Sequence, residues 1–98
     1  MRKWILEYAI LSIIKRWEAY ASDILETLKK NKLIVVEGTL YPLLSRLKTD
    51  WLISYYWIES KSWPPRKYFK LTPDWLESLK VMDSAWQELS QAINQIIN

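Results

Sequence analysis

Two short segments of this 98-residue chain hold most of the side chains that could contact a polyanion. Residues 39–48 combine hydroxyl, aromatic and cationic groups, and residues 61–67 add three cations beside a Pro-Pro pair. Hydroxyl groups and lysines suit phosphate oxygens, and an arginine can form two hydrogen bonds with a guanine edge. With two residues further upstream, the candidate DNA-binding residues are Tyr20, Ser22, Thr39, Tyr41, Pro42, Ser45, Arg46, Lys48, Lys61, Arg66 and Lys67.

Each candidate also has an ordinary structural interpretation. Tyr41 could be a core aromatic residue with its hydroxyl at the rim, and Arg46 and Lys48 could be solvated helix residues. Lys67 alternates with Tyr68 and could simply face water. The DNA-binding interpretation therefore depends on the convergence of these groups on two adjacent elements.

The residue types argue against an enzyme. The chain has no Cys and no His, which removes disulfides, thiolate chemistry, imidazole bases and zinc sites built on those ligands. A single Gly cannot build a glycine-rich phosphate loop, and no nucleophile-elbow motif is present. Carboxylates such as Glu7, Glu18 and Glu37 show no paired arrangement in the sequence. We expect no catalytic residue, no metal and no cofactor.

Eight of the eleven candidates lie in the first half of the chain, where helices must position them. Residues 2–16 predict an amphipathic helix, because apolar residues recur at helical spacing. Ser22 precedes a second apolar run and suits the N-cap of a second helix. The basic cluster at residues 29–32 suits the C-terminus of that helix.

A third helix is predicted from residue 37 onwards. Pro42 is tolerated without cost only in the first turn of a helix, so its position predicts a helix start near Leu40. The buried stripe of this helix is predicted to be Leu40, Leu43, Leu44 and Leu47.

The second half begins with a predicted β-hairpin. Residues 52–58 and 66–71 are rich in β-branched and aromatic side chains, and residues 59–65 form the turn between them. Thr72, Pro73 and Asp74 then predict the start of a last helix, with Thr72 as the cap.

The last helix has the most regular apolar spacing in the chain. Seven apolar residues are separated alternately by four and three positions, which is a heptad seam about three repeats long. The core of three short helices and a hairpin leaves no face long enough to cover such a helix, so we expect it to mediate dimerisation. The seam residues are Trp75, Leu79, Met82, Trp86, Leu89, Ile93 and Ile96.

Three helices followed by a hairpin form the layout of a winged helix-turn-helix. The predicted fold is mainly α with a small β-hairpin, in which residues 1–72 form the winged helix-turn-helix and residues 73–98 a long C-terminal dimerisation helix. Residues 1–70 carry 13 basic and 7 acidic side chains, a balance of +6, whereas residues 71–98 carry 1 and 4, a balance of −3. A basic body is suited to a polyanion and an acidic tail helix to a protein partner.

The N-terminus could be taken for a signal peptide, because Met-Arg-Lys precedes an apolar run. Glu7 interrupts that run, and charged residues 15, 16 and 18 lie between it and the small residues that resemble a cleavage site. No stretch approaches the roughly 18–20 apolar residues of a membrane-spanning helix. We therefore expect a cytoplasmic protein with no membrane partner.

Two segments resemble a known family. Residues 36–47, VEGTLYPLLSRL, resemble the recognition-helix signature of the PadR family of bacterial transcriptional regulators, and residues 64–72 resemble the wing of that family. The resemblance covers roughly residues 4–97 and is closest to the short-tailed branch of the family. It implies a homodimeric repressor in which the C-terminal helix packs against the partner's N-terminal region, where Leu6 and Ile10 would take part.

The same resemblance suggests a ligand position. Trp86 falls where some drug-binding relatives place an aromatic residue at the dimer centre, beside an apolar pore for planar ligands. A small apolar or aromatic effector could therefore contact Trp86. We favour the alternative that Trp86 is a seam residue without a ligand.

The chain departs from the family in its glycines. Where the family usually has Gly, this chain has tryptophan at positions 17, 51, 63 and 75, and also at position 4. The chain holds one Gly and seven Trp, and exchanging five of them would restore ordinary usage. We hypothesise that these five residues are glycine codons read as tryptophan. Trp51 follows the third helix, where a residue in the left-handed conformation normally ends a helix.

Two functions are compatible with these observations. The first is a sequence-specific DNA-binding transcriptional regulator, expected to be a homodimeric repressor relieved by an unknown ligand. The second is a winged-helix protein-interaction module that does not bind DNA. The basic residues on both the third helix and the wing favour the first.

Overall fold

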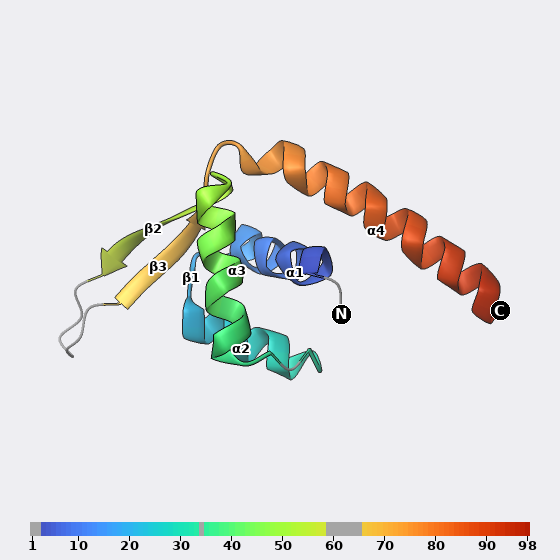
Figure 1. The fold of residues 1–98 in the computed structure, drawn as a ribbon, viewed down its shortest axis with the longest axis horizontal. Helices are drawn as coiled ribbons and strands as arrows, with labels where there is room; N and C mark the ends of the chain where they lie inside the picture. Colours follow the sequence, from blue (N-terminus) through green and yellow to red (C-terminus); the bar gives the residue numbers. More distant parts are fainter. Residues whose placement is uncertain (1–2, 34, 59–65) are drawn as a thin grey trace.

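The computed structural model describes residues 3–33, 35–58 and 66–98. The predicted fold class is confirmed, since the chain is mainly helical with a small antiparallel sheet and a long C-terminal helix (Figure 1). In chain order the elements are α1 (Lys3–Arg16), β1 (Ala19–Tyr20), α2 (Ala21–Lys30), α3 (Glu37–Thr49), β2 (Ile53–Ile58), β3 (Arg66–Leu71) and α4 (Trp75–Ile97).

The sheet has three strands in the order β1-β3-β2, all antiparallel. The pairing of β2 with β3 confirms the two predicted strands, whereas β1 is an addition that the sequence analysis missed. Tyr55 pairs with Phe69, and Tyr56 pairs with Tyr68. Because paired residues share a face of a sheet, Tyr55 and Phe69 lie on one face and the two other tyrosines lie on the opposite face. The predicted turn lies outside the described residues.

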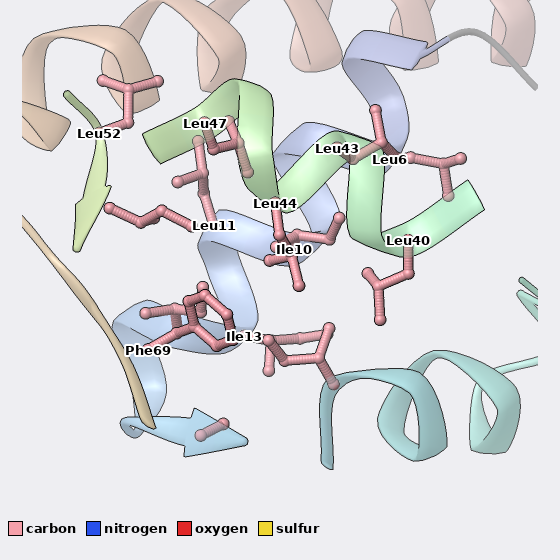
Figure 2. Close-up of a cluster of buried hydrophobic side chains, with 14 of the residues drawn as sticks. Leu6, Ile10, Leu11, Ile13, Leu40, Leu43, Leu44, Leu47, Leu52 and Phe69 are labelled. Atoms are coloured by element: carbon pink, nitrogen blue, oxygen red, sulfur yellow. The ribbon is translucent and has the colours of Figure 1, made fainter. Parts of the chain in front are cut away.

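The core is built around α1. Ile10 and Leu11 of this helix are fully buried, and the four predicted stripe leucines of α3 are buried against the same cluster. Figure 2 shows these leucines gathered around Ile10 and Leu11, with Phe69 of β3 closing one side. Burial of this apolar surface is the main term that holds α3 in place.

The second and third helices begin earlier than predicted. Helix α2 begins at Ala21, so Ser22 lies in its first turn and is not the N-cap. The Asp23 carboxylate instead accepts a hydrogen bond from the backbone N–H of Tyr20, at 3.1 Å. Helix α3 begins at Glu37, which places Pro42 in the second turn. Because proline has no N–H, Pro42 cannot donate the usual helical hydrogen bond to the carbonyl of Gly38, and the helix tolerates this loss.

The start of α4 also differs from the prediction. The Thr72 hydroxyl donates a hydrogen bond to the carbonyl of Trp51 and does not cap the helix. Asp74 occupies the N-cap position. The Thr72 side chain therefore joins the end of the sheet to the turn after α3.

Trp51 ends α3 in the left-handed conformation expected at this position. Its φ is +64°, in the left-handed region, and its side chain is 73% exposed. The N–H of Trp51 donates to the carbonyl of Lys48, and that of Leu52 donates to the carbonyl of Leu47, each at 3.0 Å. These two bonds form a Schellman motif, whose left-handed position favours glycine. Trp63 lies outside the described residues.

Helix α4 leaves the body after its first turns. Leu79 is buried in the core and Met82 packs against it, whereas Trp86, Leu89, Ile93 and Ile96 are exposed. Figure 1 shows the C-terminal half of α4 projecting away from the other elements. Among the described helices, none is long and apolar enough to cross a membrane.

Candidate nucleic-acid interface

A groove of about 480 Å³ lies between the start of α2, the exposed flank of α3 and one face of the sheet. Much of its lining comes from the candidates identified in the sequence. The predicted residues that line it are Tyr20, Ser22, Tyr41, Ser45, Lys48, Arg66 and Lys67. No Asp or Glu belongs to this lining within the described residues.

Two lysines in the groove share one tyrosine ring. The ammonium groups of Lys48 and Lys67 each lie 4.4 Å from the ring centroid of Tyr55. Lys48 also donates a hydrogen bond of 3.2 Å to the Tyr55 hydroxyl, and this bond, with the charges of both lysines, lowers the pKa of Tyr55. The ring holds two like charges at fixed positions by cation–π attraction, while both ammonium groups stay close to solvent.

A third cation, Arg66, also lines the groove. The guanidinium carbon of Arg66 lies 3.8 Å from the ring centroid of Tyr20. Arg66 also donates a hydrogen bond of 2.5 Å to the hydroxyl of Ser22. Ser22 is in the first turn of α2, where unpaired N–H groups and the helix dipole favour an anion. The three side chains together suit one phosphate group.

Four candidates are not part of this arrangement. Thr39 and Pro42 are exposed on α3 but do not line the groove. Arg46 lies on the flank of α3 that faces α1, where its Nε is 3.6 Å from Oε1 of Glu7. Its side chain is 61% exposed, against 13% for Glu7. Lys61 lies outside the described residues.

Three aromatic residues of the groove, Tyr55, Trp57 and the buried Phe69, were not among the predicted candidates. Tyr55 and Trp57 line its sheet side, and Trp57 is 57% exposed. Trp57 pairs across the strands with Lys67, whose ammonium group is 5.4 Å from the indole ring. Because cross-strand partners share a face, the choice of Lys67 as a candidate should have included its neighbours on that face.

A second aromatic cluster lies on the opposite face of the sheet and is joined to the groove through Tyr20, which belongs to both. The ring of Tyr68 packs edge-on against Tyr20 at 4.8 Å and against Tyr56 at 5.5 Å. The Tyr56 hydroxyl donates a 2.5 Å hydrogen bond to Glu18, which raises the pKa of Tyr56 to about 12. Glu18 is therefore engaged on the side of the sheet away from the groove.

A family model and several solved structures that resemble this chain all describe PadR-like transcriptional regulators. The family model described as "Transcriptional regulator PadR-like family" matches residues 10–81. A PadR-like transcription factor from Bacteroides fragilis is 53% identical, with a TM-score of 0.84, over 98% of this chain and 93% of that one. A PadR-like regulator from Bacillus cereus is 33% identical, with a TM-score of 0.84, over 98% and 94%.

A structure with lower sequence identity shares the fold of this chain. Bacillus subtilis PadR in complex with operator DNA is 23% identical and has a TM-score of 0.70, over 78% of this chain and 45% of that one. None of the curated proteins matches this chain.

Proposed function

Because this chain belongs to the PadR-like family of transcriptional regulators, and is therefore a regulator of transcription and not an enzyme, we propose that it is a homodimeric repressor. It binds operator DNA through the groove between α3 and the β2–β3 wing. The observation that carries this proposal is the lining of that groove, which among residues 3–33, 35–58 and 66–98 brings three cations and several hydroxyls together without an acidic residue.

The groove matches the backbone of a DNA duplex. With the exposed flank of α3 in the major groove, Tyr41 and Ser45 face base edges, and Lys48 reaches the neighbouring phosphates. Arg66 and Ser22 hold a phosphate further along the strand. The Bacillus subtilis relative binds operator DNA, and the shared fold supports the same mode for this chain. A cytoplasmic location follows from this role.

The exposed half of α4 supports a dimer. Trp86, Leu89, Ile93 and Ile96 are 41%, 37%, 44% and 84% exposed, and they follow the heptad spacing. A second copy would cover this row through a two-fold axis. Three residues expected at the interface, Leu6, Ile10 and Leu79, are already buried in the protomer's own core, and Met82 packs against it. The proposed seam therefore begins at Trp86.

A ligand that relieves repression would act at this seam. The Trp86 and Tyr8 rings lie 6.5 Å apart at the point where α4 leaves the body. A planar aromatic effector bound between two copies would contact both rings. Titration of the dimer with such compounds, followed by DNA affinity, tests this part of the proposal. An affinity that no compound changes would favour a seam residue without a ligand.

DNA binding is tested by fluorescence anisotropy on DNA from upstream of the protein's own gene and on scrambled DNA, across a salt series. We expect tighter binding to the upstream DNA and a steep fall with salt, because each neutralised phosphate releases counterions. Replacing Lys48 or Lys67 by Gln should reduce the slope by about 1 each.

The matched control is Lys80→Gln, since Lys80 lies on α4 away from the groove. Equal, weak and salt-insensitive binding to both DNAs would instead indicate the alternative function, a protein-interaction module.

A further inference from the structure

Two adjacent residues of α1 connect the two helices on which the proposed function depends. Glu7 pairs with Arg46 of α3, and Tyr8 donates a hydrogen bond to Asp83 of α4. We propose that Tyr8 and Asp83 are positioning residues that fix the angle of α4, and thereby the spacing between DNA half-sites that the dimer accepts. This inference rests on the proposed function, and the experiment below separates the failure of one from the failure of the other.

The bond between Tyr8 and Asp83 is short and partly shielded. The hydroxyl oxygen lies 2.5 Å from Oδ1 of Asp83. The Tyr8 ring lies between Trp4 and Trp86, with both centroids 6.5 Å away. A hydrogen bond to an ionised acceptor is stronger and more directional than one between neutral groups. Its geometry therefore constrains how α4 crosses α1.

The Tyr8–Asp83 bond lies at the point where α4 stops packing on the core and begins to project from it. Leu79 and Met82 pack on the core just before Asp83, and the apolar residues that follow are exposed. Among the described residues, no hydrogen bond joins α4 to the body beyond Asp83. The direction of the projecting half is thus set by the packing of Leu79 and Met82 on the core, followed by the Tyr8–Asp83 hydrogen bond and the adjacent Trp86 ring.

A small change of angle at this point has a large effect at the far end. The 14 residues from Asp83 to Ile97 span about 21 Å at 1.5 Å per residue. A rotation of about 10° at Asp83 would therefore move the end of the helix by about 4 Å, close to the rise of one base pair. In a two-fold dimer the seam holds α4, so the same rotation would turn the body of each protomer, and the recognition helix on it, relative to the partner.

The Glu7–Arg46 pair extends this connection to the DNA-reading helix. Oε1 of Glu7 is buried, and within the described part of the chain it has no hydrogen-bond partner apart from the ion pair with Arg46 Nε at 3.6 Å. Arg46 lies outside the groove, on the flank of α3 that faces α1. Side chains that are neighbours on α1 thus reach both α3 and α4, and they orient these two helices relative to each other.

The experiment measures spacing preference. Half-sites are first selected by the wild-type protein from a random DNA pool. Probes then carry two half-sites at the preferred spacing, or with one or two base pairs added or removed. One base pair rotates a half-site by about 35°, so the wild-type should lose roughly tenfold in affinity for each step. Tyr8→Phe and Asp83→Ala should reduce this loss to about threefold or less.

Two variants serve as controls. Asp83→Asn keeps an oxygen that accepts the Tyr8 bond but removes the charge, so it should retain most of the wild-type preference, and clearly more than Asp83→Ala. Tyr56→Phe removes a hydrogen bond of the same type and length, from Tyr56 to Glu18, on the outer face of the sheet. It should leave the preference unchanged. Dimer mass and circular dichroism are measured for every variant, so that affinities refer to folded dimer.

The outcomes separate the two proposals. A purely structural role for Tyr8 would lower the folded fraction and weaken all probes by the same factor, and an unchanged ratio between spacings would overturn this inference alone. A ratio that collapses in Tyr8→Phe and Asp83→Ala, and survives in Asp83→Asn, supports it. A wild-type protein that prefers no duplex over scrambled DNA would overturn the proposed function, and this inference with it.

Discussion

The left-handed backbone at Trp51 predicts that glycine is more stable at this position than any other residue, and the difference can be measured. Its φ of +64° brings a Cβ close to the following carbonyl, which costs about 1–2 kcal/mol for any residue other than glycine. Glycine also increases the entropy of the unfolded chain, at a cost of about 0.5–1 kcal/mol. The difference between Trp51→Gly and Trp51→Ala isolates these two terms, because both variants remove the same indole ring.

We expect Trp51→Gly to be more stable than Trp51→Ala by about 0.5–1 kcal/mol, the first term less the second. For a domain of this size the melting temperatures should then differ by about 2–8 °C. Thermal and urea unfolding are followed by circular dichroism at one fixed protomer concentration, because dimerisation makes the melting temperature concentration-dependent.

Two matched pairs define the controls. Lys32 has a φ of +69° and ends α2 with hydrogen bonds of the same pattern. Lys32→Gly should therefore be more stable than Lys32→Ala by a similar amount. Trp57 lies in β2, outside the left-handed region, so there the Ala variant should be the more stable. An Ala variant at position 51 as stable as the Gly variant would refute the reasoning.

The remaining predictions concern the seam, the ion pair, a tyrosine and the tryptophan codons. Ile93→Asp, which places a charge in the exposed apolar row, should convert the dimer to monomer by analytical ultracentrifugation and weaken DNA binding, whereas Gln95→Asp on the same helix should do neither. Arg46→Ala should weaken binding to specific and random DNA equally, because Arg46 faces Glu7 and not the groove. A loss of affinity for the specific DNA alone would show instead that Arg46 contacts a base. The hydrogen bond to Asp83, followed by burial and the Asp83 charge, raises the pKa of Tyr8 to about 12. The stability from this shift is therefore present below pH 10 and lost as pH rises from 10 to 12, so unfolding at pH 9 and pH 12 should show a smaller loss in Tyr8→Phe than in wild-type. The intact mass of protein from its native source decides the codon hypothesis, which a mass matching seven Trp would exclude.

The sequence was sufficient for those elements whose signal is local. The α3 stripe followed from leucines at helical spacing, and the two strands of the wing followed from their aromatic and β-branched residues. Strand β1 was missed because its two residues have no periodicity and depend on pairing with the distant β3. Helix α3 begins before the predicted start near Leu40, because the packing of its four leucines outweighs the cost of a proline in the second turn.

In the candidate site, too, local spacing predicts some features and tertiary packing decides the others. Spacing on α3 separates the buried stripe from the exposed residues, but it does not show which exposed flank meets α1 and which meets the wing. Tyr41, Ser45 and Lys48 turned out to share the groove, whereas Arg46 turned toward Glu7. That distinction depends on tertiary packing, which no local pattern encodes.

The positive character of the groove depends on where the acidic residues are placed as well as on the number of cations. Asp23 accepts the Tyr20 backbone N–H, Glu18 accepts the Tyr56 hydroxyl behind the sheet, and Glu7 pairs with Arg46. Each of these bonds engages a carboxylate that is not part of the lining within the described residues, and of the three only Asp23 belongs to an element that borders the groove. An acidic substitution in the lining, such as Ser45→Asp, would add a charge with no such partner beside Lys48. Weakening of DNA binding should then exceed that of any single lysine-to-glutamine variant, because one cation would be neutralised and one phosphate repelled.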